Sequence, residues 1–123
     1  MNPDFSPKRK LSEMISEMAG HFISVGKTPE EKQNRLTAAC SAWNMACGSP
    51  EVRRQQLEQY VEGYQRFNPA TSPGDLAGIR SDMESLISRK LELFPLDQRQ
   101  IVSARVVMVG DDFRIEVASA TAH

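Results

Sequence analysis

Three short segments of similar chemistry divide the first three quarters of the chain. Each contains Ser or Thr, then proline, then an acidic residue: Thr28-Pro29-Glu30-Glu31, Ser49-Pro50-Glu51 and Ser72-Pro73-Gly74-Asp75. A hydroxyl side chain caps the free N–H groups of a helix start, and proline fits the first helical position. An acidic residue is favoured by the positive end of the helix dipole. The three segments therefore predict three helix starts, and Ser6-Pro7 predicts a fourth, earlier one.

Apolar residues behind these starts recur at helical spacing, which indicates amphipathic helices with one buried face each. Gly26 and Gly48 are typical helix ends, and Pro95 stops the last helix. The sequence thus predicts a helical region over residues 7–94, preceded by a flexible arm at 1–6. The first apolar stripe contains Leu11, Met14, Ile15, Met18 and Phe22.

The residue pattern changes near position 100. Residues 100–109 and 113–119 are rich in β-branched side chains, and the second segment alternates apolar and charged residues. Gly110-Asp111-Asp112 between them is turn chemistry, in which aspartate tolerates left-handed backbone. We therefore expect an α+β fold, predominantly helical, with about four amphipathic helices followed by a C-terminal antiparallel β-hairpin. A length of 123 residues suits a single domain over 1–123.

Composition gives few hints of a partner. Net charge is −1, so no long-range field steers the whole molecule toward nucleic acid or an anionic membrane. No apolar run is long enough to span a bilayer, and polar residues interrupt the N-terminus where a signal peptide would need an apolar core. We expect a cytoplasmic protein that has no contact with membranes.

Candidate catalytic and metal-binding residues are sparse. Cys40 and Cys47 are too far apart along a helix to form a disulfide, and we expect both to pack as small hydrophobes beside Trp43. His21 is the one histidine away from the C-terminus, and no carboxylate stands at an informative spacing from it. Asp111-Asp112 is explained by the turn. We therefore expect no cofactor and no metal, and we lean toward a protein that is not an enzyme.

The hairpin raises the main functional hypothesis, because an isolated two-stranded sheet is marginally stable in water. In the first strand Val102, Ala104, Val106 and Met108 alternate with Ile101, Ser103, Arg105, Val107 and Val109, so both faces are partly apolar. A hairpin with free edges is a template for pairing, and a symmetric dimer would close it into four strands. The leading hypothesis is a non-enzymatic interaction or regulatory protein that forms a homodimer through Val102, Val106, Val107, Met108 and Phe113. In the alternative arrangement, the fourth helix and the N-terminal arm cover the hairpin completely.

Two other function classes stay open. Lys8, Arg9 and Lys10 are expected in the first turn of the first helix, where the dipole disfavours cations, so they could serve to bind nucleic-acid phosphates. A small enzyme or ligand-binding protein could also assemble its site from residues distant in sequence. The candidates for such a site are His21, Tyr60, Tyr64, Arg80 and Asp82.

Overall fold

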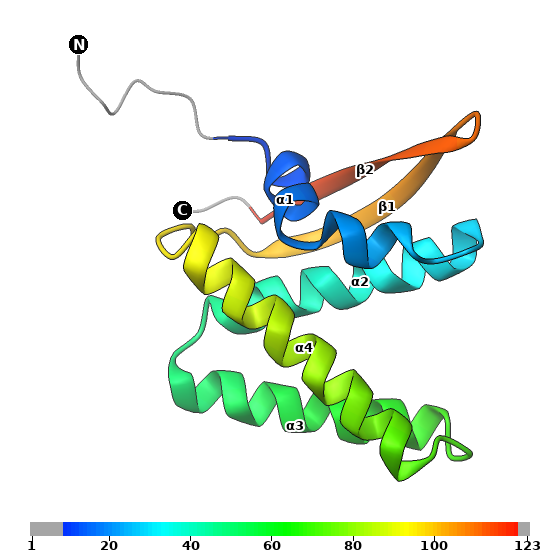
Figure 1. Ribbon diagram of the computed structural model, residues 1–123. Coiled ribbons are helices and arrows are strands. Elements are labelled where there is room, and N and C mark those ends of the chain that lie inside the picture. The colour runs from blue at the N-terminus through cyan, green and yellow to red at the C-terminus, as the bar shows by residue number, and fades with distance from the viewer. Residues whose placement is uncertain (1–8, 121–123) are drawn as a thin grey trace.

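The fold is α+β, with helices followed by a C-terminal antiparallel hairpin, as predicted (Figure 1). A computed structural model describes residues 9–120, so Lys8 and the expected arm at 1–6 lie outside the described residues. The elements in order are α1 (Leu11–Ser24), α2 (Pro29–Ala46), α3 (Pro50–Phe67), α4 (Pro73–Leu93), β1 (Ile101–Val109) and β2 (Asp112–Ser119). None of the described helices has both the length and the apolar character required to cross a bilayer.

The three Ser/Thr-Pro helix starts are confirmed. The hydroxyls of Thr28, Ser49 and Ser72 each accept a hydrogen bond from the backbone N–H three residues on, at 3.1, 3.3 and 3.0 Å. At Thr28 the capping box is complete, because the Glu31 carboxylate accepts the Thr28 backbone N–H at 3.0 Å. Local chemistry therefore fixes where α2, α3 and α4 begin.

The start of α1 differs from the prediction. Arg9 and Lys10 precede the helix, which begins at Leu11 with Lys10 as an extended N-cap residue that makes no side-chain cap. Tertiary contacts hold this segment extended: the Arg9 backbone carbonyl accepts a hydrogen bond from Arg99 Nη2 at 3.0 Å. The Arg9 guanidinium also forms an ion pair with Glu17, which lies in the second turn of α1.

Helix α2 is the centre of the packing. It lies between the hairpin with α1 on one side and α3 with α4 on the other (Figure 1), and it contacts all four of these neighbours. Trp43 and Leu36 of α2 are fully buried, together with Ile15 and Ile23 of α1. Helix α3 adds only Leu57 and Val61 to the buried core. The hairpin thus packs on α1 and α2, the helices that hold most of the fully buried side chains.

The hairpin contains a register irregularity that the sequence pattern did not reveal. Ile101 lies opposite Ser119 and Ser103 lies opposite Ala118, so Val102 is an extra residue in β1. Ile101 is consequently buried in the core, whereas Val102 is 65% exposed. The expectation that Ile101 shares a face with Ser103 and that Val102 shares one with Ala104 is therefore wrong at the start of the strand.

The tight turn depends on Gly110 alone. Gly110 has a φ of 64°, and no other residue within 9–120 has a left-handed backbone. Val109 pairs with Asp112, which leaves Gly110 and Asp111 as a two-residue loop with glycine first. The expected left-handed role of the aspartates is wrong, because glycine supplies the positive φ without steric cost.

Candidate interaction edge of the hairpin

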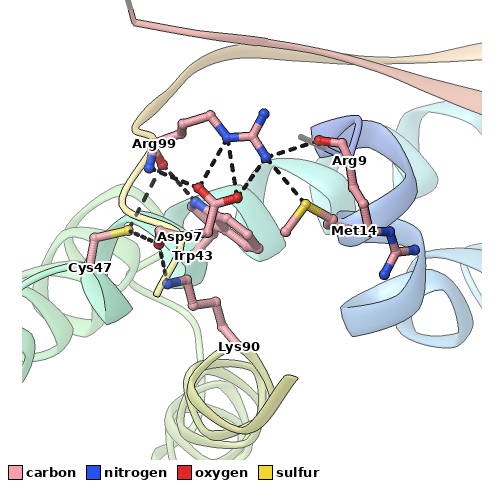
Figure 2. A network of polar contacts seen from close by, with 7 residues as sticks. All are labelled: Arg9, Met14, Trp43, Cys47, Lys90, Asp97 and Arg99. Carbon is pink, nitrogen blue, oxygen red and sulfur yellow. Dashed lines mark hydrogen bonds and ion pairs between the residues drawn. The ribbon is translucent and has the colours of Figure 1, made fainter. Parts of the chain in front are cut away.

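A polar network anchors the segment that leads from α4 into β1 (Figure 2). Trp43 Nε1 donates to the Arg99 carbonyl oxygen at 2.8 Å. The fully buried Lys90 donates from Nζ to the Asp97 carbonyl oxygen at 2.5 Å, and its ammonium lies 4.9 Å from the centroid of the Trp43 ring. A buried ammonium requires such partners, since an unpaired charge in the interior is costly. These contacts fix the connection to β1 from below.

An ion pair between Asp97 and Arg99 anchors the same segment from above. The guanidinium Nη2 lies 2.6 Å from Asp97 Oδ2, and both side chains are largely buried. The hydrogen bond from Arg99 holds the pKa of the Asp97 carboxyl below its usual value. The same guanidinium contacts Met14 Sδ at 3.3 Å as well as the carbonyl of Arg9. Arg99 thus ties the beginning of β1 to the beginning of α1.

Both cysteines are free thiols beside this network. The Cys47 thiol donates weakly to the Asp97 carbonyl oxygen, at 3.7 Å. Burial raises the pKa of the Cys47 thiol and raises that of Cys40 to about 12. A thiol that stays protonated is a poor nucleophile and a poor metal ligand. Within residues 9–120, no three His, Cys, Asp or Glu side chains are grouped so that they could hold a metal ion.

The outer edge of β1 is closed by two side-chain amides of α2. Gln33 Nε2 donates to the Ala104 carbonyl oxygen at 3.0 Å, and Gln33 Oε1 accepts the Val106 N–H at 2.7 Å. Asn44 makes the same two bonds to Ile101: Nδ2 donates to the Ile101 carbonyl oxygen at 2.9 Å, and Oδ1 accepts the Ile101 N–H at 2.8 Å. Each carboxamide uses one donor and one acceptor, as a peptide group of a neighbouring strand would. An incoming strand therefore finds these backbone groups occupied.

The outer edge of β2 has the opposite character. Because Ala104 and Val106 direct their backbone groups away from β2, the residues opposite them, Val117 and Ile115, direct theirs away from β1. Over the part of the chain that the structure describes, no other element bonds to the outward N–H or C=O of Ile115 or Val117. Among the outward groups of Phe113, Ile115 and Val117, the Phe113 N–H alone has a partner within residues 9–120, the Asp112 carboxylate at 2.7 Å. We call the outward backbone of Phe113, Ile115 and Val117 the β2 edge.

The two faces of the hairpin differ in polarity. Val106, Phe113, Ile115 and Val117 are partly buried against the core on the inner face, next to α1 and α2. In the alternative arrangement the fourth helix and the N-terminal arm were to cover the hairpin. Among the described elements α4 packs against α1, α2 and α3 and not against the hairpin, and the arm lies outside the described residues.

On the outer face three charged side chains form one cluster. Arg105 Nε lies 2.6 Å and Arg114 Nη2 lies 3.1 Å from the Glu116 carboxylate. Hydrogen bonds from Arg105 and then Arg114 lower the pKa of the Glu116 carboxyl. Glu116 is therefore ionised at neutral pH, and the cluster carries charges of both signs beside the β2 edge.

The predicted interface residues are thereby divided between three environments. Val106 and Phe113 pack inward, and Val107 is half-buried on the outer face. Val102 and Met108 are 65% and 41% exposed. The predicted interface residues do not share one face of the hairpin, so the backbone of β2 is its more distinctive feature.

The predicted basic group is only partly placed by the structure. Arg9 is paired with Glu17, and its guanidinium also lies 5.6 Å from the centroid of the Phe94 ring. Lys10 is exposed, and Lys8 lies outside the described residues. An ion-paired arginine is less available to phosphate than an unpaired one, and the nucleic-acid hypothesis stays a prediction.

The residues proposed for a composite ligand site come together in part. Tyr60, Tyr64 and Asp82 line a half-open groove of about 210 Å³ together with Phe22 and Arg35. Burial raises the pKa of the Tyr60 hydroxyl. This volume is below the range of about 300–1,000 Å³ that is typical of small-molecule sites.

The other two residues of that composite site lie elsewhere. His21 lines a neighbouring hollow of about 390 Å³, which shares Phe22 and Asp82 with the groove. Arg80 forms an ion pair with Glu58. The five candidates therefore do not form one site.

Comparison of the chain with protein-family models, with curated proteins and with solved structures finds no match. Gln33 and Asn44, which bond to the edge of β1, were not singled out by the sequence. The only signal was the position of Asn44 between the apolar residues Trp43 and Met45.

Proposed function

We propose that this chain is a non-enzymatic interaction protein that self-associates through its C-terminal hairpin, by pairing the β2 edges of two copies. The observation that carries the proposal is the asymmetry of the hairpin. Gln33 and Asn44 occupy the edge of β1, whereas the outward groups of Ile115 and Val117 have no partner in another described element. A row of unpaired strand groups is a template for another strand.

Dimerisation is favoured over open-ended growth because α2 bonds to the edge of β1 at Ile101, Ala104 and Val106, which leaves β2 as the more open edge of each copy. Pairing β2 with β2 of a second copy gives the strand order β1-β2-β2-β1, with an α2 helix closing each outer edge. A two-fold arrangement uses the same surface on both copies and leaves no further edge. It also continues the apolar inner face from one copy into the next.

The proposal extends to the cellular compartment of the protein. Free thiols at Cys40 and Cys47 suit a reducing compartment, which supports the cytoplasm as the place of action. The outer face beside the β2 edge carries Arg114 and Glu116, so its charges are complementary to those of an identical copy. This self-complementarity favours a second copy over a uniformly charged partner such as nucleic acid.

The test uses two substitutions at Val117 and measures mass by light scattering after size exclusion. The wild type is expected at twice 13.8 kDa. Val117→Pro removes an N–H that points away from β1, so it should weaken the dimer while keeping the hairpin. Val117→Ala is the matched control: it shortens the side chain, keeps the N–H and should remain a dimer. Circular dichroism reports whether each variant is folded.

A monomeric wild type at the highest soluble concentration would refute the proposal, as would a folded proline variant that is as dimeric as the alanine variant. Amide hydrogen exchange on the wild type provides a reading that needs no variant. The N–H groups of Ile115 and Val117 should become protected as protein concentration rises. Protection that is independent of concentration would contradict pairing at this edge.

A further inference from the structure

The charges beside the β2 edge and the length of the strand together select one register for the self-association, and we infer that the two-fold axis passes through Ile115. This inference rests on the proposed function and adds the alignment of the two strands. Outward backbone groups occur on every second residue, at Phe113, Ile115 and Val117. A symmetric antiparallel pair must place such groups opposite one another, so the axis passes through a residue near the middle of the strand.

Two of the central positions bring like charges together. An axis through Arg114 places the two Arg114 side chains directly opposite each other and sets Asp112 against the partner's Glu116. An axis through Glu116 places the two Glu116 side chains opposite each other. Like charges that face each other across a strand pair are destabilising. Both registers are therefore disfavoured by residues on the outer face.

An axis through Val117 avoids repulsion and gains no attraction. In that register Glu116 faces the partner's Ala118, and Arg114 faces the partner's Ala120. No charged pair crosses the interface. This register also shortens the overlap, because Val117 lies near the end of β2, which finishes at Ser119.

An axis through Phe113 would pair opposite charges, Arg114 with the partner's Asp112. Because β2 begins at Asp112, however, the paired strands would overlap over only three residues before reaching the turn.

An axis through Ile115 makes every cross-strand charge pair attractive and keeps a longer overlap. Arg114 then faces the partner's Glu116, and by symmetry Glu116 faces the partner's Arg114. The Ile115 residues of the two copies exchange both backbone hydrogen bonds, while Phe113 and Val117 meet across the apolar inner face. Opposite charges directly across a strand pair stabilise it.

The charged side chains are free enough to make these contacts. Within one copy, Arg114 lies 3.1 Å from Glu116, and their side chains are 63% and 37% exposed. In the paired sheet the two arginines and two glutamates alternate around the axis, so each charge keeps its own neighbour and gains one from the partner. The register therefore does not break the existing cluster with Arg105.

Charge reversal gives a direct test of this register. Arg114→Glu leaves only acidic side chains at positions 114 and 116, and Glu116→Arg leaves only basic ones. Each variant alone should dimerise at least about 10-fold more weakly than the wild type, because both attractive pairs become repulsive. An equimolar mixture of the two should form a heterodimer, since acidic and basic copies are complementary. The double variant Arg114→Glu/Glu116→Arg should again form a homodimer.

Arg66→Glu provides the matched control for the first variant. It makes the same change of charge on the exposed last turn of α3 and should leave the dimer unchanged. Sedimentation velocity at fixed concentration measures the dimer fraction, and thermal unfolding checks that each variant is folded.

A cysteine test reads the register without changing charge. Residues directly opposite in a hydrogen-bonded antiparallel pair have Cα atoms about 5.5 Å apart, which suits a disulfide. Ile115→Cys should therefore cross-link two copies under mild oxidation by dissolved oxygen. Val117→Cys is the control and should not, because the two substituted residues lie several positions apart.

The outcomes separate this inference from the proposed function. A wild-type monomer contradicts both. A wild-type dimer whose single charge variants stay fully dimeric, or whose mixture gains no heterodimer, keeps association at the edge and overturns the axis through Ile115. Cross-linking at Val117 in preference to Ile115 would place the axis at Val117 instead.

Discussion

The two edges of the hairpin have similar strands and very different surroundings. β1 is richer in apolar residues, yet both backbone groups of Ile101, the carbonyl of Ala104 and the N–H of Val106 are bonded to α2. β2 alternates apolar and charged residues, as a strand at a surface does, and the outward groups of Ile115 and Val117 have no hydrogen-bond partner in another described element. Openness to a partner is thus decided by the neighbouring helix and not by the composition of the strand.

This difference shows how a helix can terminate a sheet. Proteins often protect an edge with charges, proline or a bulge within the strand itself. Here the protection comes mainly from two carboxamides on one helix, while the bulge at Val102 affects only the beginning of β1. Removing either amide should make the two edges more alike, and this prediction can be measured.

The largest expected effect is at Asn44, which bonds both backbone groups of the buried Ile101. Asn44→Ala leaves a donor and an acceptor without partners, at a cost of about 2–4 kcal/mol in the free energy of unfolding. Urea unfolding measures the loss. Asn34→Ala makes the same chemical change at an exposed position of the same helix and should cost less than about 0.5 kcal/mol. Equal losses at the two positions would contradict the role given to Asn44.

A smaller loss is expected at Gln33, where the bonded groups of Ala104 and Val106 are only half-buried. Gln33→Ala should cost about 1 kcal/mol and should also open the second edge. With two open edges per copy, assemblies larger than dimers should form as concentration rises, which sedimentation velocity detects. Gln33→Glu is the control: it keeps the acceptor for the Val106 N–H and loses the donor to the Ala104 carbonyl. Its loss of stability and its tendency to form larger assemblies should therefore lie between those of the wild type and Gln33→Ala. A variant limited to dimers would argue that Gln33 does not guard the edge.

The smallest effect concerns the anchor that positions β1. The pKa of the folded-state Asp97 carboxyl is lowered by Arg99, so the ion pair stabilises the fold above the unfolded-state pKa of about 4. That contribution should disappear as pH falls through the lower, folded-state pKa. It should amount to about 1 kcal/mol or less for one pair that keeps some contact with solvent. The difference in unfolding free energy between the wild type and Asp97→Asn should shrink over that acidic range, and a constant difference would exclude the ion pair as its cause.

Helix starts were predictable because their causes are local. A capping hydroxyl, a proline and an acid lie within four residues, and the Thr28 and Ser72 caps form as the sequence indicates. The start of α1 was not predictable in this way. It depends on Arg99, which reaches the Arg9 carbonyl from far along the chain.

The candidate edge was predicted only in outline. Apolar alternation identified the hairpin and its capacity for pairing, but neither the bulge at Val102 nor the closing of β1 leaves a mark on that pattern. Gln33 resembles any polar residue of a helix, since nothing near it in sequence marks the distant strand it bonds. Contacts across long separations are set by the packing of α2 on β1, which single-sequence patterns do not encode.

Gln33 and Asn44 are about three turns apart on α2, so both project from one side of the helix toward β1. The distance between the two amides along α2 therefore matches the distance between the backbone groups that they bond along β1. One inserted residue between them would rotate the second amide by about 100° and carry it away from Ile101. Length variation among any relatives of this chain should therefore be excluded from the middle of α2 and from residues 101–106, and should concentrate in connections such as the one between α3 and α4.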